Sequence, residues 1–232
     1  MSLPGNRIYT RINRPDPDLV AAFRGQATPN IADNMSRMFC ACSAISPVLP
    51  DMKLCGPAFT VKVNPGDNLF IHKALDLAQP GDIVVVDGQG DPTNALIGEI
   101  MVRYAASRGI GGLVLDGTMR DYDGIAAFGA LPVFSRGYTP MGPYKNGCGE
   151  INTVIACGGA VVRPGDIVVG DADGVVFIPV QDARHVLAAT QAISAKEKQI
   201  FADIKAGCYD RTWVDAKLRQ TGTDIVDDVY QF

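Results

Sequence analysis

Apolar and polar positions along the chain change their spacing several times, and each change predicts a different element. Residues 59–63 alternate between apolar and polar side chains, which is typical of a half-buried strand. Residues 83–86 form a continuous apolar run that ends at Asp87, and this favours a buried strand. Residues 69–78 repeat their apolar side chains at helical spacing behind Asn68, so they predict an amphipathic helix.

The segment 80–124 predicts a βαβ unit around which the rest of the chain is organised. In order, it consists of a strand ending at Asp87, a glycine-rich loop, an amphipathic helix opening at Gly98 and Glu99, a second strand ending at Asp116, and a polar turn with Arg120 and Asp121. Because the parallel strands of such a unit end at one edge of a sheet, the loops that follow them should converge there. We therefore expect the chemistry of the protein at this edge.

The flanking segments predict further elements. They are a Pro-rich arm with a short helix over 1–24, a helix capped by Thr28 that runs to about Met38, a strand over 132–134, a loop over 135–149, a hairpin of 154–156 and 160–162, and a long helix over 182–206. A loop of this length is usually functional or interfacial. We expect one domain over 25–206 and a tail over 207–232, whose Trp213 and Tyr230 would pack on a neighbouring subunit.

One turn and strand occur twice. Residues 164–171 read PGDIVVGD and closely copy residues 80–87, which read PGDIVVVD. A repeat architecture requires at least three such copies, and the sequence has no third. The repeat therefore indicates pseudo-symmetry inside one domain.

The composition is that of an ordinary globular protein. The chain has 232 residues, 47% of them hydrophobic, with a formal net charge of −4 and a pI near 5.1. Nucleic acid is not expected as a partner, because phosphate binding requires clustered Lys and Arg. No apolar run reaches the roughly 20 residues of a membrane-spanning helix, and no signal pattern begins the chain. We expect a cytoplasmic protein without membrane contact.

The cysteines and histidines of the chain offer few candidate catalytic residues. The six cysteines include no CxxC pair and no zinc-like spacing, so reduced thiols are expected. The two histidines, His72 and His185, lie in predicted helices and are expected at the surface or at the edge of the core. A Ser-His-Asp or Cys-His mechanism is therefore disfavoured.

The glycine-rich loop and the following helix start are two candidate ligand sites. Gly88-Gln89-Gly90 follows a strand as a dinucleotide-binding loop does, but the third glycine of that fingerprint is missing, since position 93 is Thr. Nucleotide binding is therefore disfavoured. The backbone N–H groups at Gly98 and Glu99 could bind a carboxylate or phosphate. Alternatively, Glu99 only complements the helix dipole.

The dipeptide Arg120-Asp121 is the third candidate. Asp121 could hold a hard divalent cation together with waters and substrate oxygens. Arg120 could stabilise negative charge that develops on a substrate oxygen. An adjacent pair of this kind can also be a surface ion pair or a helix cap. Its place after a parallel strand, at the same edge as Gly98, favours a functional role.

These motifs together resemble the RraA-like family over about residues 25–220. The resemblance is carried by Gly98-Glu99, by Arg120-Asp121, by PGDIVVVDG from residue 80, and by RPGDIVVGDADGVVFIP over 163–179. The family contains class II 4-hydroxy-4-methyl-2-oxoglutarate and 4-carboxy-4-hydroxy-2-oxoadipate aldolases and the regulator of ribonuclease E. It implies an α/β layered sandwich of the swivelling phosphohistidine-domain type, assembled as homotrimers or homohexamers with sites between subunits.

The resemblance also implies an activity and a role for each residue. In the aldolases, the backbone matching Gly98, Glu99, Ile100 and Met101 binds the pyruvyl carboxylate, the residue matching Arg120 contacts the keto or enolate oxygen, and the one matching Asp121 ligates Mg²⁺ or Mn²⁺. Arg120, Glu99 and Asp121 are thus the expected catalytic residues. The implied reaction is metal-dependent retro-aldol cleavage of a 4-hydroxy-2-oxo di- or tricarboxylic acid to pyruvate, with oxaloacetate decarboxylation as a side activity. The alternative is a non-enzymatic regulator that binds a protein such as ribonuclease E.

The sequence departs from the aldolases at Gly124. An acidic residue often lies there, three positions after the metal-binding aspartate, whereas this chain has Asp123 one step earlier. The departure concerns the surroundings of the metal and therefore the choice of substrate. An acidic residue of the long helix, Glu197, is a candidate to reach a neighbouring subunit's site.

Overall fold

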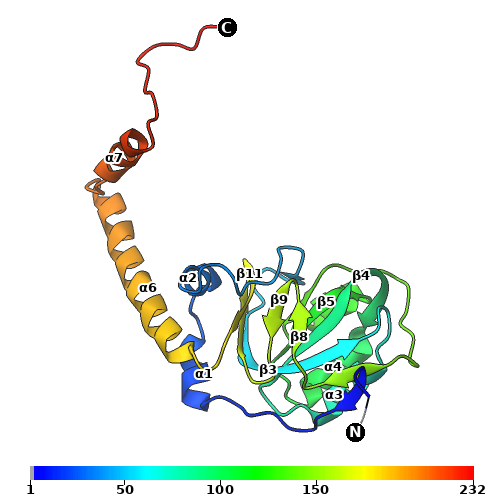
Figure 1. Cartoon of the computed structure of the whole chain (residues 1–232). Coiled ribbons are helices and arrows are strands. Elements are labelled where there is room, and N and C mark those ends of the chain that lie inside the picture. Colours follow the sequence, from blue (N-terminus) through cyan, green and yellow to red (C-terminus); the bar gives the residue numbers. More distant parts are fainter. Residues whose placement is uncertain (1–2) are drawn as a thin grey trace. The chain divides into compact units, whose positions relative to one another are not determined.

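The computed structural model describes residues 3–232 and has a mixed α/β fold (Figure 1). The strands are β1 (Asn6–Ile8), β2 (Ser46–Pro47), β3 (Leu54–Val63), β4 (Ile83–Ile97), β5 (Gly112–Met119), β6 (Val133–Ser135), β7 (Gly149–Ile151), β8 (Ile155–Cys157), β9 (Ala160–Val162), β10 (Ile167–Asp171) and β11 (Gly174–Ile178). The helices are α1 (Pro17–Phe23), α2 (Thr28–Asp33), α3 (Leu69–Leu77), α4 (Glu99–Ser107), α5 (Tyr122–Phe128), α6 (Ala183–Ala206) and α7 (Thr212–Gln220).

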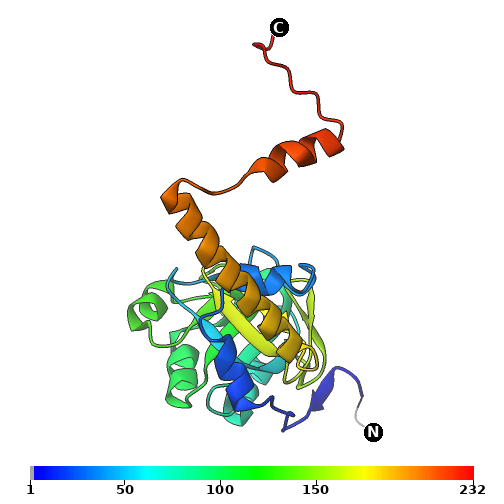
Figure 2. The same cartoon turned by 90° about the vertical axis from the view of Figure 1, so that its left-hand side faces the viewer.

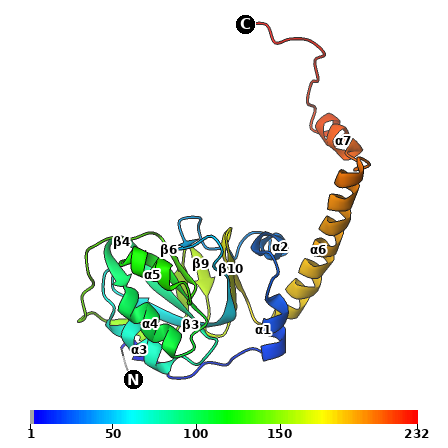
Figure 3. The same cartoon turned by 180° about the vertical axis from the view of Figure 1, so that it is seen from behind.

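Four parallel strands form the middle of the main sheet. Hydrogen-bonded neighbours follow the order β1-β7-β3-β4-β5-β6-β2, and β3, β4, β5 and β6 are parallel. The helices α3, α4 and α5 connect these strands in turn, which is the kind of crossover that parallel neighbours require. All three helices lie on one face of the sheet (Figure 3). The predicted βαβ unit is thus part of a longer alternating series.

The two faces of the sheet bury two separate sets of side chains. One face packs Val84, Val86 and their neighbours against α3, α4 and α5. The other packs Ile83, Val85 and their neighbours against the antiparallel hairpin of β8 and β9. Successive residues of a strand point to opposite faces, so a continuous apolar run is what a doubly covered strand needs. The layered α/β fold predicted from the sequence is confirmed.

The repeated PGD segment has a shared local geometry. Gly81 and Gly165 have φ values of 86° and 90°, a left-handed conformation that glycine adopts without strain. In each copy the following aspartate is buried and accepts a backbone N–H from three residues earlier: Asp82 from Gln79 at 2.8 Å and Asp166 from Arg163 at 2.8 Å. The strands that follow pair with the two halves of β3, β10 antiparallel and β4 parallel.

The amino-terminal arm is anchored at the same end of the sheet as these turns. Arg14 donates two hydrogen bonds to the buried carboxylate of Asp82, at 2.9 and 2.7 Å. The arm begins with β1, which pairs in parallel with β7, and it ends at α1 (Figure 2).

A third core joins α1, α2 and the first turns of α6 to β10 and β11.

Three element boundaries differ from the prediction. β4 does not end at Asp87 but continues to Ile97 with irregular register, and Gln89 and Gly90 take positive φ values of 60° and 70° within it. The expected glycine-rich loop is therefore an irregular strand extension. β5 likewise continues past Asp116 to Met119.

The helix predicted from Thr28 to about Met38 ends at Asp33. Ser36 and Arg37 have positive φ values, which an α-helix does not allow. Thr28 is the first helical residue rather than the cap, and its hydroxyl donates to Asp171 at 2.6 Å instead of accepting a backbone N–H of its own helix.

The chain divides into a first compact unit up to Gln191 and a second from Ala192 onward. The second unit contains the later turns of α6, helix α7 and the tail, and it exposes Phe201, Trp213 and Tyr230. Helix α7 was not among the elements predicted from the sequence. No helix within residues 3–232 has the length and apolar character needed to cross a bilayer. The boundary after residue 206 and the packing of the tail on another subunit stay predictions.

Candidate active site

The carboxyl ends of β4 and β5 bring the two predicted motifs together. Ile97 ends β4 and leads through Gly98 into α4, while Met119 ends β5 and leads through Arg120 and Asp121 into α5. The Arg120 N–H donates to the Ile97 carbonyl at 3.0 Å, so the two strand ends are directly bonded. Gly98, Glu99, Arg120 and Asp121 therefore lie side by side.

Asp121 is turned toward the neighbouring helix by its backbone. It occupies the N-cap position of α5 in the left-handed conformation, with φ 63° and ψ 40°, and its side chain does not cap that helix. Instead, its Oδ2 accepts the Glu99 N–H of α4 at 3.0 Å and lies 3.7 Å from the Arg120 Nε. The amino end of α4 thus binds a carboxylate from within the chain, as its unpaired N–H groups and dipole favour.

Gly98 provides the space for this arrangement. Its φ of −142° is open to any residue, so its backbone does not require glycine. A Cβ at this position would collide with Asp121 Oδ2 and would lie 3.2 Å from Arg120 Cγ. Glycine is required here because two side chains of the site cross directly over its Cα.

Glu99, the first residue of α4, is held by Arg103 one turn later in the same helix. Its Oε1 accepts from Arg103 Nε at 2.7 Å and pairs with Arg103 Nη2 at 2.6 Å. The Arg103 guanidinium also lies 4.5 Å from the ring centroid of Phe128 in α5, within the range of a cation–π contact. The Glu99 carboxylate rests against Gly124, where a Cβ would be 2.5 Å from Glu99 Cδ. The glycine that departs from the aldolase pattern therefore makes room for a carboxylate supplied by α4.

A pocket of about 140 Å³ lies beside these residues. Five of the predicted site residues line it: Gly98, Ile100, Met101, Arg120 and Asp121. Four further residues complete the wall: Asn68, His72, Pro143 and Lys145. Glu99 is not among the lining residues, because its side chain is turned toward Arg103 and Gly124.

Asn68 lines this pocket and has a buried acceptor without a partner. The residue is 2% exposed, and its Nδ2 donates to the Leu96 carbonyl at 3.0 Å and to Met101 Sδ at 3.3 Å. Those two acceptors fix the orientation of the amide, since the opposite orientation would face Oδ1 toward a carbonyl. Asn68 Oδ1 has no hydrogen-bond partner among residues 3–232. An unsatisfied buried acceptor of this kind favours a ligand that donates a hydrogen bond.

The other added residues make the pocket wall positive. Lys145 and Arg120 both carry a positive charge, and burial followed by the charge of Lys145 lowers the pKa of His72. Lys145 lies on the predicted 135–149 loop, which Asp67 fixes: Asp67 Oδ2 accepts the N–H groups of Asn146 at 2.8 Å and Gly147 at 2.7 Å. No role in the site was predicted for His72 or Lys145 from the sequence. The length of the loop and the one-turn spacing of His72 from Asn68 were the available signals.

The backbone of α4 has fewer N–H groups open to a substrate carboxylate than the sequence predicted. Of its first three N–H groups, that of Glu99 binds Asp121 and that of Met101 binds the Gly98 carbonyl at 3.0 Å. Only the Ile100 N–H lacks an acceptor within residues 3–232, and the Ile100 side chain is 83% exposed. A substrate carboxylate at this helix would therefore meet one open N–H group and the Arg120 guanidinium.

These features define a layered α/β domain with an acid- and arginine-containing pocket at the carboxyl ends of its parallel strands. The RraA-like family model, described as Aldolase/RraA, matches residues 28–177. The chain belongs to this family.

Known relatives agree with that assignment. A protein of Halalkalibacterium halodurans named "Putative 4-hydroxy-4-methyl-2-oxoglutarate aldolase" is 40% identical over 188 residues, covering 81% of this chain and 87% of its own. The crystal structure of Streptomyces coelicolor RraAS2, described as an unusual member of the RNase ES inhibitor RraA protein family, is 27% identical with a TM-score of 0.73 and covers 83% of this chain and 98% of its own. An uncharacterized Pseudomonas syringae protein shares the fold, with 24% identity, a TM-score of 0.74, and coverage of 84% and 96%.

Proposed function

We propose that the protein is a divalent-metal-dependent lyase that cleaves a 4-hydroxy-2-oxo di- or tricarboxylic acid and releases pyruvate. The observation that carries the proposal is the pocket in which Arg120, Asp121 and the start of α4 meet. Relatives named as aldolases of this substrate class support it. Arg120 and Lys145 in the wall suit an acid with more than one carboxylate, and the buried, unpaired Oδ1 of Asn68 suits its hydroxyl group.

Asp121 fits a hard cation such as Mg²⁺ or Mn²⁺. No group of three or more His, Cys, Asp or Glu side chains within residues 3–232 is arranged for metal binding, so a cage made only of protein ligands is not expected. Mg²⁺ typically uses one or two carboxylates and completes its shell with water and substrate oxygens. The Asp121 side chain is 44% exposed, and its Oδ1 accepts no hydrogen bond from residues 3–232. When bound, the cation would act as a Lewis acid toward the substrate oxygens.

The pocket residues would each have a different role in binding the substrate and stabilising the enolate. The Ile100 N–H and the Arg120 guanidinium would hold the 2-oxo acid end, while Lys145 and His72 face the distal carboxylate. Asn68 Oδ1 would accept the hydrogen bond of the C4 hydroxyl and orient it. In the reaction that hydroxyl loses its proton, C4 becomes a carbonyl, and the electron pair of the C3–C4 bond passes into the pyruvate enolate. Arg120 stabilises the enolate oxygen, and protonation at C3 completes pyruvate.

Oxaloacetate decarboxylation is the expected side activity. Loss of carbon dioxide from oxaloacetate leaves the same pyruvate enolate, so Arg120 and Asp121 would serve both reactions. We also propose that the protein works in the cytoplasm as a homotrimer or homohexamer. The exposed Phe201, Trp213 and Tyr230 of the second unit are the surfaces available for such contacts.

A pyruvate-release assay with several 4-hydroxy-2-oxo acids, with and without a chelator, tests the proposal. Wild type should release pyruvate only with a divalent cation, and Asp121→Asn should lose most of this activity. Asp123→Asn is the matched control, since it removes a neighbouring carboxylate that does not line the pocket. Activity that survives both the chelator and Asp121→Asn would refute the metal-dependent reaction.

A non-enzymatic regulator is the second candidate function. It is favoured by the likeness to the Streptomyces coelicolor structure, which is described as belonging to a family of RNase ES inhibitors. If no tested acid yields pyruvate and the protein slows RNA cleavage by a purified ribonuclease E-type enzyme, the regulator replaces the aldolase.

A further inference from the structure

A second cavity of the first unit lies far from the candidate active site. It has a volume of about 530 Å³ and is lined from five segments: Arg24 to Ala27, Lys53 to Cys55, Gly81, Gly111, and Val169 to Asp171. Gly81 and Gly111 lie just before β4 and β5, whereas the candidate active site follows the far ends of the same strands. The eight residues of β5 alone separate the two ends by about 25 Å. The cavity therefore belongs to a different site.

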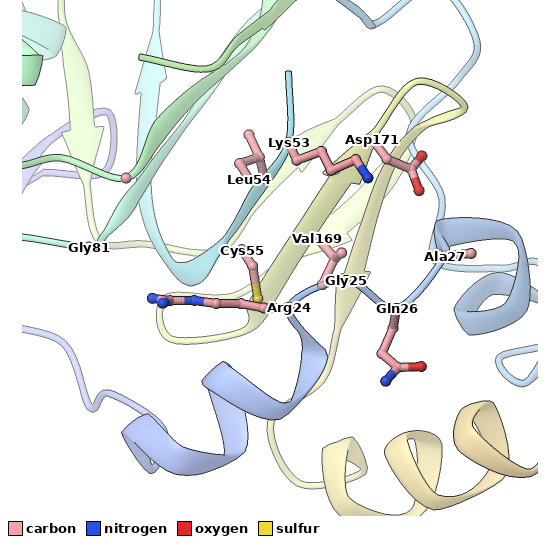
Figure 4. A pocket seen from close by; sticks show the side chains of 12 residues that line it. Arg24, Gly25, Gln26, Ala27, Lys53, Leu54, Cys55, Gly81, Val169 and Asp171 are labelled. Carbon is pink, nitrogen blue, oxygen red and sulfur yellow. The ribbon is translucent and has the colours of Figure 1, made fainter. Parts of the chain in front are cut away.

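The floor of this cavity is apolar and uncharged. Leu54 and Val169 are 4% and 3% exposed and form part of the floor. Cys55 lies between Arg24 and Val169 in Figure 4, and its thiol donates to the Val20 carbonyl at 3.3 Å. Burial raises the pKa of the Cys55 thiol to about 11, so the group stays neutral near pH 7. The wall therefore offers an apolar body a place to pack, as ligand pockets of this size commonly do.

The rim of the cavity carries more positive than negative charge, with Arg24 and Lys53 against Asp171. Arg24 and Lys53 extend toward different sides of the cavity (Figure 4). Among residues 3–232, neither side chain forms an ion pair. The one carboxylate of the lining, Asp171, is already bonded, since it accepts the Thr28 N–H at 2.9 Å and the Thr28 hydroxyl at 2.6 Å. A negatively charged ligand would therefore meet two cations and one carboxylate whose oxygens already accept hydrogen bonds.

We propose that this cavity is a second small-molecule site that binds an organic carboxylate with an apolar body. The acid group pairs with Arg24, whose planar guanidinium suits bidentate binding of a carboxylate. Lys53 adds a second positive charge, and the body of the ligand packs on Leu54, Val169 and Cys55. The proposal does not depend on the reaction at Asp121.

Calorimetric titration with benzoate and with inorganic phosphate tests the site at fixed ionic strength. Benzoate should bind the full-length wild type, and phosphate should bind at least about tenfold more weakly because it has no apolar body to bury. Arg24→Gln should weaken benzoate binding by about tenfold or more, the usual effect of losing a charged hydrogen bond, and Lys53→Gln by less.

Two control variants locate the binding. Arg37→Gln removes an exposed cation of the same region that pairs with Asp33 and does not line the cavity, so it should leave benzoate affinity unchanged. Arg120→Gln should also leave it unchanged, because Arg120 lines the candidate active site instead. The proposal is wrong if wild type does not bind benzoate, if phosphate binds as tightly, or if either control weakens binding as much as Arg24→Gln does.

Discussion

The substitution Gly124→Ala should disturb the geometry of the candidate active site while changing the stability of the protein only slightly. In the wild type, the Glu99 carboxylate lies against the Gly124 Cα, and a Cβ would be 2.5 Å from Glu99 Cδ and 3.2 Å from Oε1. Carbon atoms in contact normally lie about 3.5–4.0 Å apart, so the carboxylate must move by roughly 1 Å or more. That movement takes Glu99 away from the Arg103 guanidinium.

The expected effect on stability is small and can be positive. Losing an exposed i,i+4 pair such as Glu99–Arg103 costs about 0.3–0.5 kcal/mol. Replacing glycine by alanine inside α5 returns up to about 1 kcal/mol through helix propensity. Thermal unfolding should therefore show an unchanged or slightly higher Tm.

The expected effect on function is a loss. Glu99 is one of the expected catalytic residues and its N–H holds Asp121 Oδ2, so displacing it should lower metal affinity or kcat/KM by about 10- to 100-fold, as outer-shell changes at metal sites typically do. Mn²⁺ binding measured by calorimetry, beside the pyruvate-release assay, separates metal affinity from turnover. Ala127→Gly is the matched control in the same helix, and it should lower Tm while leaving metal affinity unchanged.

A double substitution shows whether Gly124 acts through Glu99. In a Glu99→Gln background, Gly124→Ala should add little further loss, because both changes remove the same interaction. The reasoning is refuted if Gly124→Ala keeps wild-type metal affinity and activity, or if its effect is fully additive with Glu99→Gln.

Three further predictions concern other contacts. Asn68→Ala should raise KM about tenfold for a 4-hydroxy-2-oxo acid but little for oxaloacetate, which lacks the hydroxyl that Asn68 Oδ1 would accept; equal effects on both substrates would contradict this. Asp67→Ala should loosen residues 135–149, because it removes the oxygen that accepts the N–H groups of Asn146 and Gly147, and hydrogen exchange of those residues should rise. The hydrogen bond from Arg7 lowers the pKa of Glu150 below its usual 4.5, so the pair stabilises the folded chain above that pH and loses its effect as pH falls through the lowered pKa. Arg7→Gln should therefore lower Tm by about 2–4 °C at pH 7, and the difference should vanish in strong acid.

The sequence was sufficient for the elements that depend on local pattern. The apolar run before Asp87 and the repeated PGD segment predicted a turn followed by a buried strand correctly in both places. The irregular end of β4 was predicted as a loop because glycine and proline usually interrupt strands. Its pairing with β5 is a tertiary effect, and a single-chain pattern does not contain it.

The site could be predicted only in part for the same reason. Residues next to each other in sequence, such as Arg120 and Asp121, were found as a motif. His72 and Lys145 lie 73 residues apart in the numbering and meet only because Asp67 draws the 135–149 loop to the start of α3. The second cavity is lined by segments that lie still further apart in the sequence, and no sequence motif indicates it.

Gly98 and Gly124 show that a glycine can be required for space rather than for its backbone conformation. Glycine in a sequence is usually interpreted as a turn or a flexible point, yet neither Gly98 nor Gly124 has a positive φ. Both are required for space: one lets Asp121 reach the Glu99 N–H, and the other lets the Glu99 carboxylate rest on α5. The positions of the Asp121 and Glu99 side chains therefore depend on the lack of a Cβ at Gly98 and at Gly124. Gly98→Ala should accordingly leave the fold intact and displace Asp121, which makes metal affinity rather than Tm the sensitive measurement at both positions.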